Sequence, residues 1–176
     1  NYDQNFNIGT QAVRLGIDFA ANRNEEASIT FVDDEGNVDY EDSSGNIYYP
    51  KWKANLAMRA QVIDFRFTWV INYIGSTEQL EAYVDEWDEA ITGASNTCSG
   101  PPDDVFCRDY ADTDDYWLHS TSLYWYGDTW TLGAGIRNVF DERPPYVDGT
   151  EYTSINRVPI GAGYDRFGRV YFLNLR

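Results

Sequence analysis

The sequence has no long apolar run, a single histidine, a single methionine and no basic patch. No stretch approaches the ~20 apolar residues that a membrane-spanning helix requires, so a helical membrane protein is excluded. With 29 acidic residues against 13 basic ones, the net charge of −16 argues against nucleic acid as a partner. Low mean hydropathy does not exclude transmembrane β-strands, because only every second residue of such a strand faces lipid.

Cysteine is scarce as well. Cys98 and Cys107 are separated by a Pro-Pro pair in an acidic, glycine-containing stretch, which favours a surface disulfide formed in an oxidising compartment over two free thiols. His119 has no second soft ligand to join it, so neither a metal site nor another cofactor is predicted. The sequence also lacks a nucleophile motif and a phosphate-binding glycine loop. We therefore expect no catalytic residues and no enzyme.

Aromatic residues, in contrast, make up 16% of the chain, with 14 Tyr and 6 Trp. Such side chains suit positions that are apolar on one side and wet on the other, as in the aromatic girdles of outer-membrane β-barrels. A Tyr-rich soluble β-sandwich would have the same composition. The order of the residues must therefore separate the two classes.

Apolar and polar residues alternate strictly in several segments. From Trp52 to Val62 every second residue is apolar, and after a short turn at Ile63-Asp64 a second segment from Phe65 to Tyr73 repeats the pattern. A period of two predicts two-faced strands, here joined as a hairpin. The whole chain is predicted to form about seven strands, mostly of about 9–11 residues, the length that a tilted strand needs to cross a bilayer. The other five are expected over residues 12–22, 27–32, 116–126, 129–139 and 169–176.

The expected connections alternate in length. Turns near Asn22, Asp64 and Asp128 are short, whereas residues 33–50, 76–115 and 140–168 form long connections. Outer-membrane barrels place short periplasmic turns at one end and long extracellular loops at the other, a division that a Greek-key sandwich does not usually show. The apolar phase of the strands should then face lipid. The residues predicted to do so are Leu56, Met58, Phe67, Trp69, Ile71, Leu132 and Ile136.

The connection over residues 76–115 is the most acidic part of the chain, with twelve carboxylates against Arg108 alone. It is predicted to be a long acidic extracellular loop, with a short helix over residues 80–91. Aromatic residues in it and beside it are candidates for stacking on a ligand, although packing within the loop or in an interfacial girdle is the simpler interpretation of each. These candidates are Tyr83, Trp87, Tyr110, Tyr116 and Trp117.

Two C-terminal segments resemble TonB-dependent outer-membrane receptors. Residues 133–145, GAGIRNVFDERPP, are similar to the penultimate-strand signature of that family, and residues 161–169, GAGYDRFGR, to its last loop and last strand. Residues 50–52 and 73–76 also resemble the family, and the resemblance covers about residues 10–176. Gly133 and Gly135 are expected to leave room for a plug domain inside the barrel. The structural motif residues are Asn138, Phe140, Asp141, Pro144, Pro145, Tyr164, Asp165, Gly168 and Arg169.

The resemblance implies an all-β fold, an antiparallel transmembrane β-barrel in the bacterial outer membrane. Residues 1–176 would be the C-terminal part of such a barrel and supply about seven strands of a larger, 22-stranded one. The implied partners are the remainder of the receptor with its N-terminal plug and other barrel strands, the TonB complex, outer-membrane lipid, and a small-molecule or oligosaccharide ligand. Among a ferric siderophore, a cobalamin-like ligand and an oligosaccharide, the acidic and aromatic loops favour the sugar, because they would repel an anionic siderophore.

Two features depart from the family pattern and suggest a fragment. The chain opens at Asn1 without a signal peptide or plug, and it ends at Leu175-Arg176 instead of on an aromatic residue. Two other classes remain open. One is a small outer-membrane barrel of eight strands for adhesion or stability, with a further strand within residues 37–49. The other is a secreted β-sandwich binding module.

Overall fold

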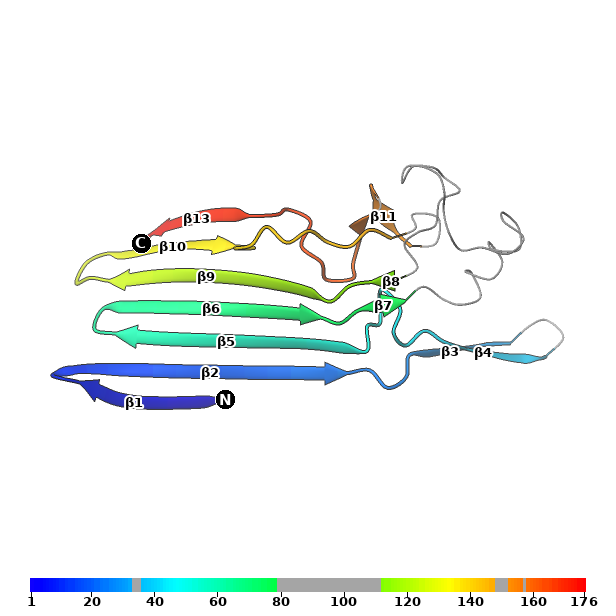
Figure 1. Cartoon of the computed structure of the whole chain (residues 1–176), viewed down its shortest axis with the longest axis horizontal. Helices are drawn as coiled ribbons and strands as arrows, with labels where there is room; N and C mark the ends of the chain where they lie inside the picture. The colour runs from blue at the N-terminus through cyan, green and yellow to red at the C-terminus, as the bar shows by residue number, and fades with distance from the viewer. Residues whose placement is uncertain (33–35, 79–111, 148–151, 157) are drawn as a thin grey trace.

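A computed structural model describes residues 1–32, 36–78, 112–147, 152–156 and 158–176. The fold of this part is all-β, with one antiparallel sheet of seven strands and three small two-stranded sheets (Figure 1). Among the described residues, no helix is long and apolar enough to cross a membrane.

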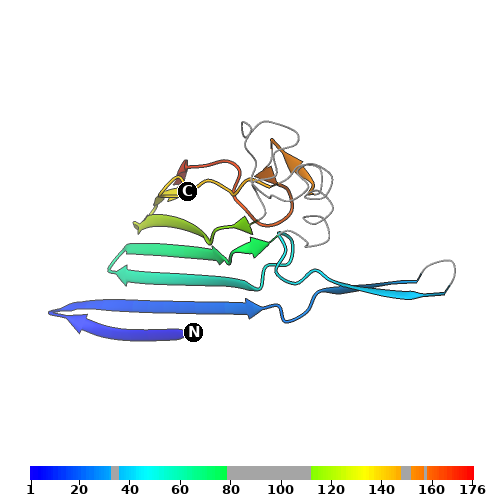
Figure 2. The ribbon, with the colours of Figure 1, turned by 45° about the vertical axis from the view of Figure 1, so that its right-hand side comes forward.

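The main sheet is a meander in which each strand pairs with its neighbour in the order β1-β2-β5-β6-β9-β10-β13. The sheet is not closed, and β1 and β13 are its two edges. Figure 2 shows the same single layer of strands after a turn of the molecule. Its strands are β1 (Tyr2–Ile8), β2 (Gln11–Arg23), β5 (Trp52–Val62), β6 (Phe65–Ile74), β9 (Tyr116–Tyr126), β10 (Thr131–Arg137) and β13 (Val170–Leu175).

Most of the predicted strands are confirmed. The hairpin of β5 and β6 turns at Ile63 and Asp64 as predicted, and Ile63 adopts a positive φ of 52° there. β9 has the predicted bounds, whereas β10 ends at Arg137, two residues earlier than expected. An all-β antiparallel fold therefore follows from the alternation alone, but closure into a barrel does not.

Two details of the N-terminal part were predicted wrongly. The connection expected near Asn22 is short, over residues 24–27, but it leads into a separate ribbon and does not return along the sheet, because β2 ends at Arg23, which pairs with Trp52. The strand predicted over residues 27–32 does form, as β3 (Ser28–Val32), but it pairs with β4 (Val38–Asp42) in a separate ribbon. Its place in the main sheet is taken by β1, which pairs with β2 through a turn at Gly9.

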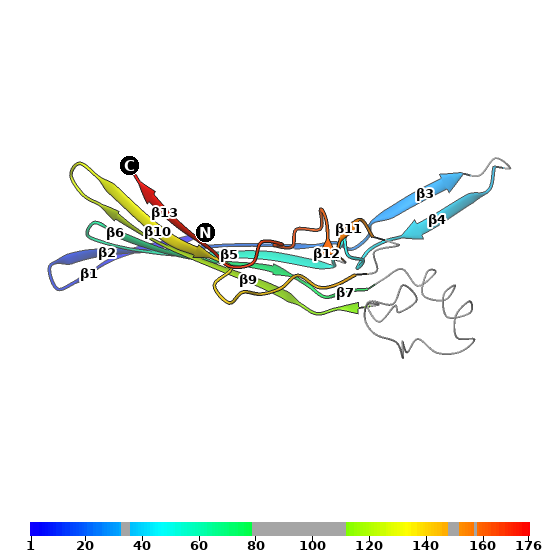
Figure 3. The ribbon, with the colours of Figure 1, turned by 90° about the horizontal axis from the view of Figure 1, so that it is seen from above.

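The second strand of the ribbon, β4, lies within the region predicted as a long connection over residues 33–50. The further strand suggested within residues 37–49 is therefore β4, and it lies outside the main sheet (Figure 3). Two shorter pairs stand at the same end of the molecule. They are β7 (Thr77–Glu78) with β8 (Asp112–Thr113), and β11 (Ser154–Ile155) with β12 (Val158–Pro159). The helix predicted over residues 80–91 lies outside the described residues.

The register divides the sheet into an apolar and a polar face, since directly paired residues of antiparallel strands share a face. In the middle of the sheet, Met58 pairs with Trp69 and Phe67 with Leu123 on the apolar face. No described segment packs a second sheet on this face, and many of its large side chains are exposed, up to 76% for Leu173. All seven residues predicted to face lipid belong to it: Leu56, Met58, Phe67, Trp69, Ile71, Leu132 and Ile136.

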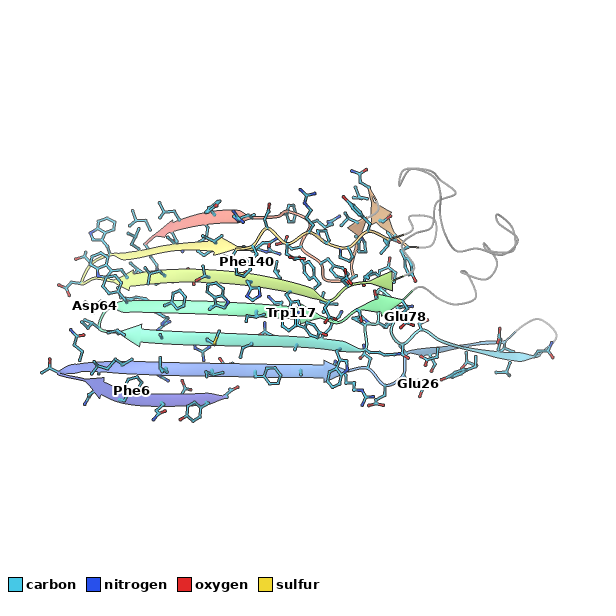
Figure 4. All side chains as sticks on the ribbon, viewed as in Figure 1. Phe6, Glu26, Asp64, Glu78, Trp117 and Phe140 are labelled. Carbon is cyan, nitrogen blue, oxygen red and sulfur yellow. The ribbon has the colours of Figure 1, made fainter. Side chains whose placement is uncertain are left out.

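The two ends of the sheet differ as predicted. Asp64 lies at the end with the short turns and Glu78 at the end with the long connections (Figure 4). A small buried core forms at the long-connection end and consists of Ile47, Ile74, Tyr116, Leu118, Val147, Tyr152, Ala162 and Tyr164. Three of these residues belong to the polar face, so the segment after β10 folds over that face near its long-connection end.

Candidate functional site

The two segments that resemble the receptor family meet at this end of the sheet. Arg137 Nε lies 3.0 Å from Asp165 Oδ2, and the backbone N–H of Arg169 donates to Asp141 Oδ1 at 2.9 Å. Residues 133–145 and 161–169 are thus joined by these two contacts. The structure brings together motif residues that the sequence separates.

Asn138 and Asp141 shape the chain where β10 ends. Both adopt a positive φ, 54° and 57°, a conformation in which Asn and Asp are enriched. The fully buried Asn138 side chain donates to the carbonyl of Glu142 at 2.8 Å and accepts from the N–H of Glu142 at 2.7 Å. These two hydrogen bonds satisfy the backbone carbonyl and N–H of Glu142 within the turn. Pro144 and Pro145 follow it, half-buried, but they do not end the strand pairing, which has already stopped at Arg137.

Phe140 leaves this turn toward the apolar face. Its ring is 60% exposed, and its centroid lies 4.9 Å from that of His119 and 6.4 Å from that of Trp69. The indole N–H of Trp69 donates to His119 Nδ1 at 3.2 Å, which satisfies both polar groups on an otherwise apolar surface. Phe140 is labelled in Figure 4. Its place makes it part of the apolar surface and not of the small core.

Asp165 ties the last connection to the sheet from a buried position. Its side chain is fully buried, and Oδ1 accepts from the N–H of Phe167 at 3.1 Å. Its own N–H donates to the hydroxyl of Tyr116 at 3.3 Å. The contact with Arg137 is an ion pair without the alignment of a hydrogen bond. A buried carboxylate with these partners favours one position of the connection.

Tyr164 packs beside Asp165 in the small core. Its ring meets that of Tyr116 edge-on, with centroids 5.1 Å apart. Burial raises the pKa of its hydroxyl, whose oxygen is buried without a hydrogen bond to any described residue. The hydroxyls of Thr77 and Thr113 are themselves 2.7 Å apart. The base of the acidic connection is therefore closed by a hydrogen bond between these two threonines.

A groove of about 540 Å³ lies on the polar face beside this core. Lys53 and Asn55 of β5, Asn72 of β6 and Arg137 of β10 line it, and Gly163 borders it from the last connection. Asn55 Nδ2 donates to Asn72 Oδ1 at 2.7 Å. Lys53 Nζ donates to the carbonyl of Ala162 at 3.4 Å. The groove thus holds cations and amides side by side.

The residues predicted to contact a ligand do not share one surface. Tyr116 is 3% exposed and belongs to the core, whereas Trp117 is 48% exposed on the apolar face, with its ring 4.4 Å from that of Tyr73. Two consecutive residues of a strand point to opposite faces, so they cannot border one site. Tyr83, Trp87 and Tyr110, together with Cys98 and Cys107, lie outside the described residues.

The expected role of two motif glycines needs correction. Gly133 and Gly135 are not open to an approaching domain, because a Cβ on Gly133 would overlap the ring of Tyr124 and one on Gly135 the ring of Phe172. Each aromatic residue is the direct cross-strand partner of its glycine. The rings cover the glycines, a device that compensates for a glycine within a strand.

No family model, curated protein or solved structure matches the chain. The resemblance to TonB-dependent receptors therefore rests on the sequence segments described above alone. Among the described residues, no group of three His, Cys, Asp or Glu side chains is placed to hold a metal ion.

Proposed function

We propose that the chain forms part of the wall of an outer-membrane β-barrel, and that the complete protein is an active transporter that resembles a TonB-dependent receptor. The observation that carries this proposal is the apolar face of the seven-stranded sheet. A soluble β-sandwich would cover such a face with a second sheet, and no described segment does so. Outer-membrane lipid is the cover that a barrel wall requires.

The aromatic residues of this face support a membrane position. Tyr73 and Trp117 pair in one row near the long connections, and Phe65 and Trp125 pair in another near the short turns. The eight residue steps from Phe65 to Tyr73 span about 26 Å along the strand. With a strand tilt of about 35–45°, the rows are roughly 20 Å apart across the bilayer, close to the height of the apolar band in such barrels. The rows between them combine aliphatic residues, such as Leu123 and Ile71, with Phe67, Trp69, Thr121 and His119.

The polar face would line the lumen, and other strands would close the barrel. A single-chain bacterial barrel of this kind has an even number of antiparallel strands, so seven require completion by strands outside the main sheet. β3 and β4 do not supply them, because both belong to the separate ribbon. The plug, the TonB complex and the transported nutrient remain parts of the proposal, and the chain is proposed to have a binding role, not a catalytic one.

Deleting residues 80–110 from the complete protein tests the division between wall and recognition surface. The deletion spares the main sheet and both strands of the β7–β8 pair, so the protein should stay in the outer-membrane fraction and keep heat-modifiable migration. Binding of the imported nutrient to whole cells should weaken. If the undeleted protein does not fractionate with the outer membrane, the membrane proposal is contradicted. Unchanged binding by an inserted deletion variant would contradict recognition by Tyr83, Trp87 and Tyr110.

A further inference from the structure

The polar face of the sheet is positively charged although the chain as a whole carries −16. Only two carboxylates lie on this face of the seven strands, Asp3 and Asp18. They form ion pairs with Arg14 and Arg59. The cations of the same face are Arg14, Lys53, Arg59, Arg66 and Arg137. Five cations against two carboxylates therefore leave this face of the seven strands with a net positive charge.

Two of these five cations, Lys53 and Arg137, line the groove beside the core. Lys53 makes no ion pair within the described part of the chain, and its one hydrogen bond is the 3.4 Å contact with a carbonyl. Arg137 binds Asp165 through Nε, which leaves its terminal nitrogens without another carboxylate among the described residues. No Asp or Glu lines the groove. Lys53 is therefore the lining cation that no described carboxylate compensates, and a groove with such a cation and no lining carboxylate is suited to an anion.

The remaining lining adds hydrogen-bonding groups to the charge. Asn22, Asn55 and Asn72 present amides to the groove, and each amide has both donors and acceptors. Because the Asn55–Asn72 bond uses one donor and one acceptor, the other groups of both amides can still bind hydroxyls. Leu118 supplies an apolar patch beside them. The volume of about 540 Å³ falls within the range of small-molecule sites.

We propose that this groove binds a small organic anion whose body carries hydroxyl groups, with Lys53 as the main contact of its carboxylate and Asn55 and Asn72 as contacts of its hydroxyls. The proposal deepens the transport function and rests on it, because the polar face is then the lumen wall. The acidic sequence of residues 76–115 argues for a neutral sugar, but the lining of the groove favours an acidic one. The compact negative charge of a sugar acid can be neutralised by Lys53.

Glucuronate and its neutral analogue glucose are the probes that test this inference. Their binding to the complete protein in detergent is measured by calorimetry at low salt and again at high salt. Glucuronate should bind at least about tenfold more tightly than glucose, and its affinity should fall with added salt because the groove is open to solvent. Equal affinity for the two sugars, or no binding of glucuronate, would overturn the proposal.

Three variants locate the site. Lys53→Gln should weaken glucuronate binding by about tenfold to a hundredfold, the usual loss for a charge-assisted hydrogen bond, and Lys53→Arg should restore much of it. Arg66→Gln is the matched control, since Arg66 lies on the same face at the short-turn end, stacked 5.2 Å from the ring centroid of Tyr126. Equal losses in Lys53→Gln and Arg66→Gln would show a general charge effect and overturn the groove as the site.

Failure of this inference is distinguishable from failure of the transport proposal. Outer-membrane fractionation of the protein does not depend on Lys53, which lies on the polar face. A protein that inserts into the membrane but ignores glucuronate contradicts the groove alone. A protein that binds glucuronate through Lys53 but does not fractionate with the outer membrane contradicts the transport proposal and leaves the anion site in place.

Discussion

The backbone N–H of Arg169 donates to the carboxylate of Asp141, 28 residues earlier in the chain, at a distance of 2.9 Å. Gly168 makes this contact possible. It adopts a φ of +68°, and a Cβ placed on it would lie 3.0 Å from Asp141 Oδ1. The entry to the last strand therefore depends on a glycine for two separate reasons, backbone conformation and space.

Replacing Gly168 by Ala should destabilise the folded protein by about 1–2 kcal/mol from the backbone conformation alone, with a further cost from crowding Asp141. Gly9→Ala is the matched control, because Gly9 has a φ of +62° but no atom within 4 Å of the added Cβ. Denaturant unfolding of both variants separates the two costs. Equal losses of unfolding free energy would show that the contact with Asp141 adds nothing.

Gly133→Ala should also destabilise, against the usual gain of about 0.5–1 kcal/mol when Ala replaces Gly within a strand. The reason is the ring of Tyr124, which occupies the space that the new methyl group needs. In a Tyr124→Ser background the same substitution should become neutral or stabilising. A double-mutant cycle on unfolding free energies measures this coupling, and a cycle without coupling would contradict the covering role of Tyr124.

The root of the β3–β4 ribbon should depend on pH through Asp42. The N–H groups of Ser44 and Ala27 donate to Asp42 Oδ1 at 2.9 Å and 3.1 Å, and these bonds lower the pKa of the carboxyl. A lowered pKa contributes stability that is present above the ordinary Asp value of about 4 and is lost as pH falls through the lowered value. Amide hydrogen exchange at Ala27 and Ser44 checks this.

The matched variant is Asp42→Asn, which keeps an acceptor oxygen but cannot titrate. Exchange at the two amides, corrected for the intrinsic effect of pH, should then stay constant over the same range. Asp39→Asn, in the same ribbon, should leave the wild-type pH dependence in place. A wild-type protein whose protection does not change in acid would contradict the role given to Asp42.

The alternation of residues predicted the central strands because it is unbroken there and the turn at Ile63 and Asp64 is tight. It missed β1, in which Gln4 interrupts the apolar phase and Asp3, Asn5 and Asn7 are residue types depleted in strands. β2 was predicted to within one residue at each end, but the contact of its last residue was not: Arg23 packs over the ring of Trp52 at 5.5 Å. Local composition does not show such a cross-strand contact.

The site was predicted less well than the fold. The period of two that predicted β9 also places Tyr116 and Trp117 on opposite faces of the sheet. The sequence itself therefore excluded a ligand surface shared by these two residues. The groove residues Lys53, Asn55 and Asn72 were visible as the polar phase of their strands. Their meeting with Arg137 depends on the pairing of β6 with β9 across a connection of about forty residues, which no local pattern fixes.

Spin labels on β6 and β9 test most directly whether the apolar face contacts lipid. Labels at Phe67 and Leu123, which pair on the apolar face, are compared with labels at Thr68 and Ser122, which pair on the polar face. In outer-membrane preparations, the first pair should be accessible to oxygen and shielded from a water-soluble nickel chelate, and the second pair should show the reverse. Labels at Phe67 and Leu123 that are shielded from both reagents, as in a core between two sheets, would contradict the membrane account.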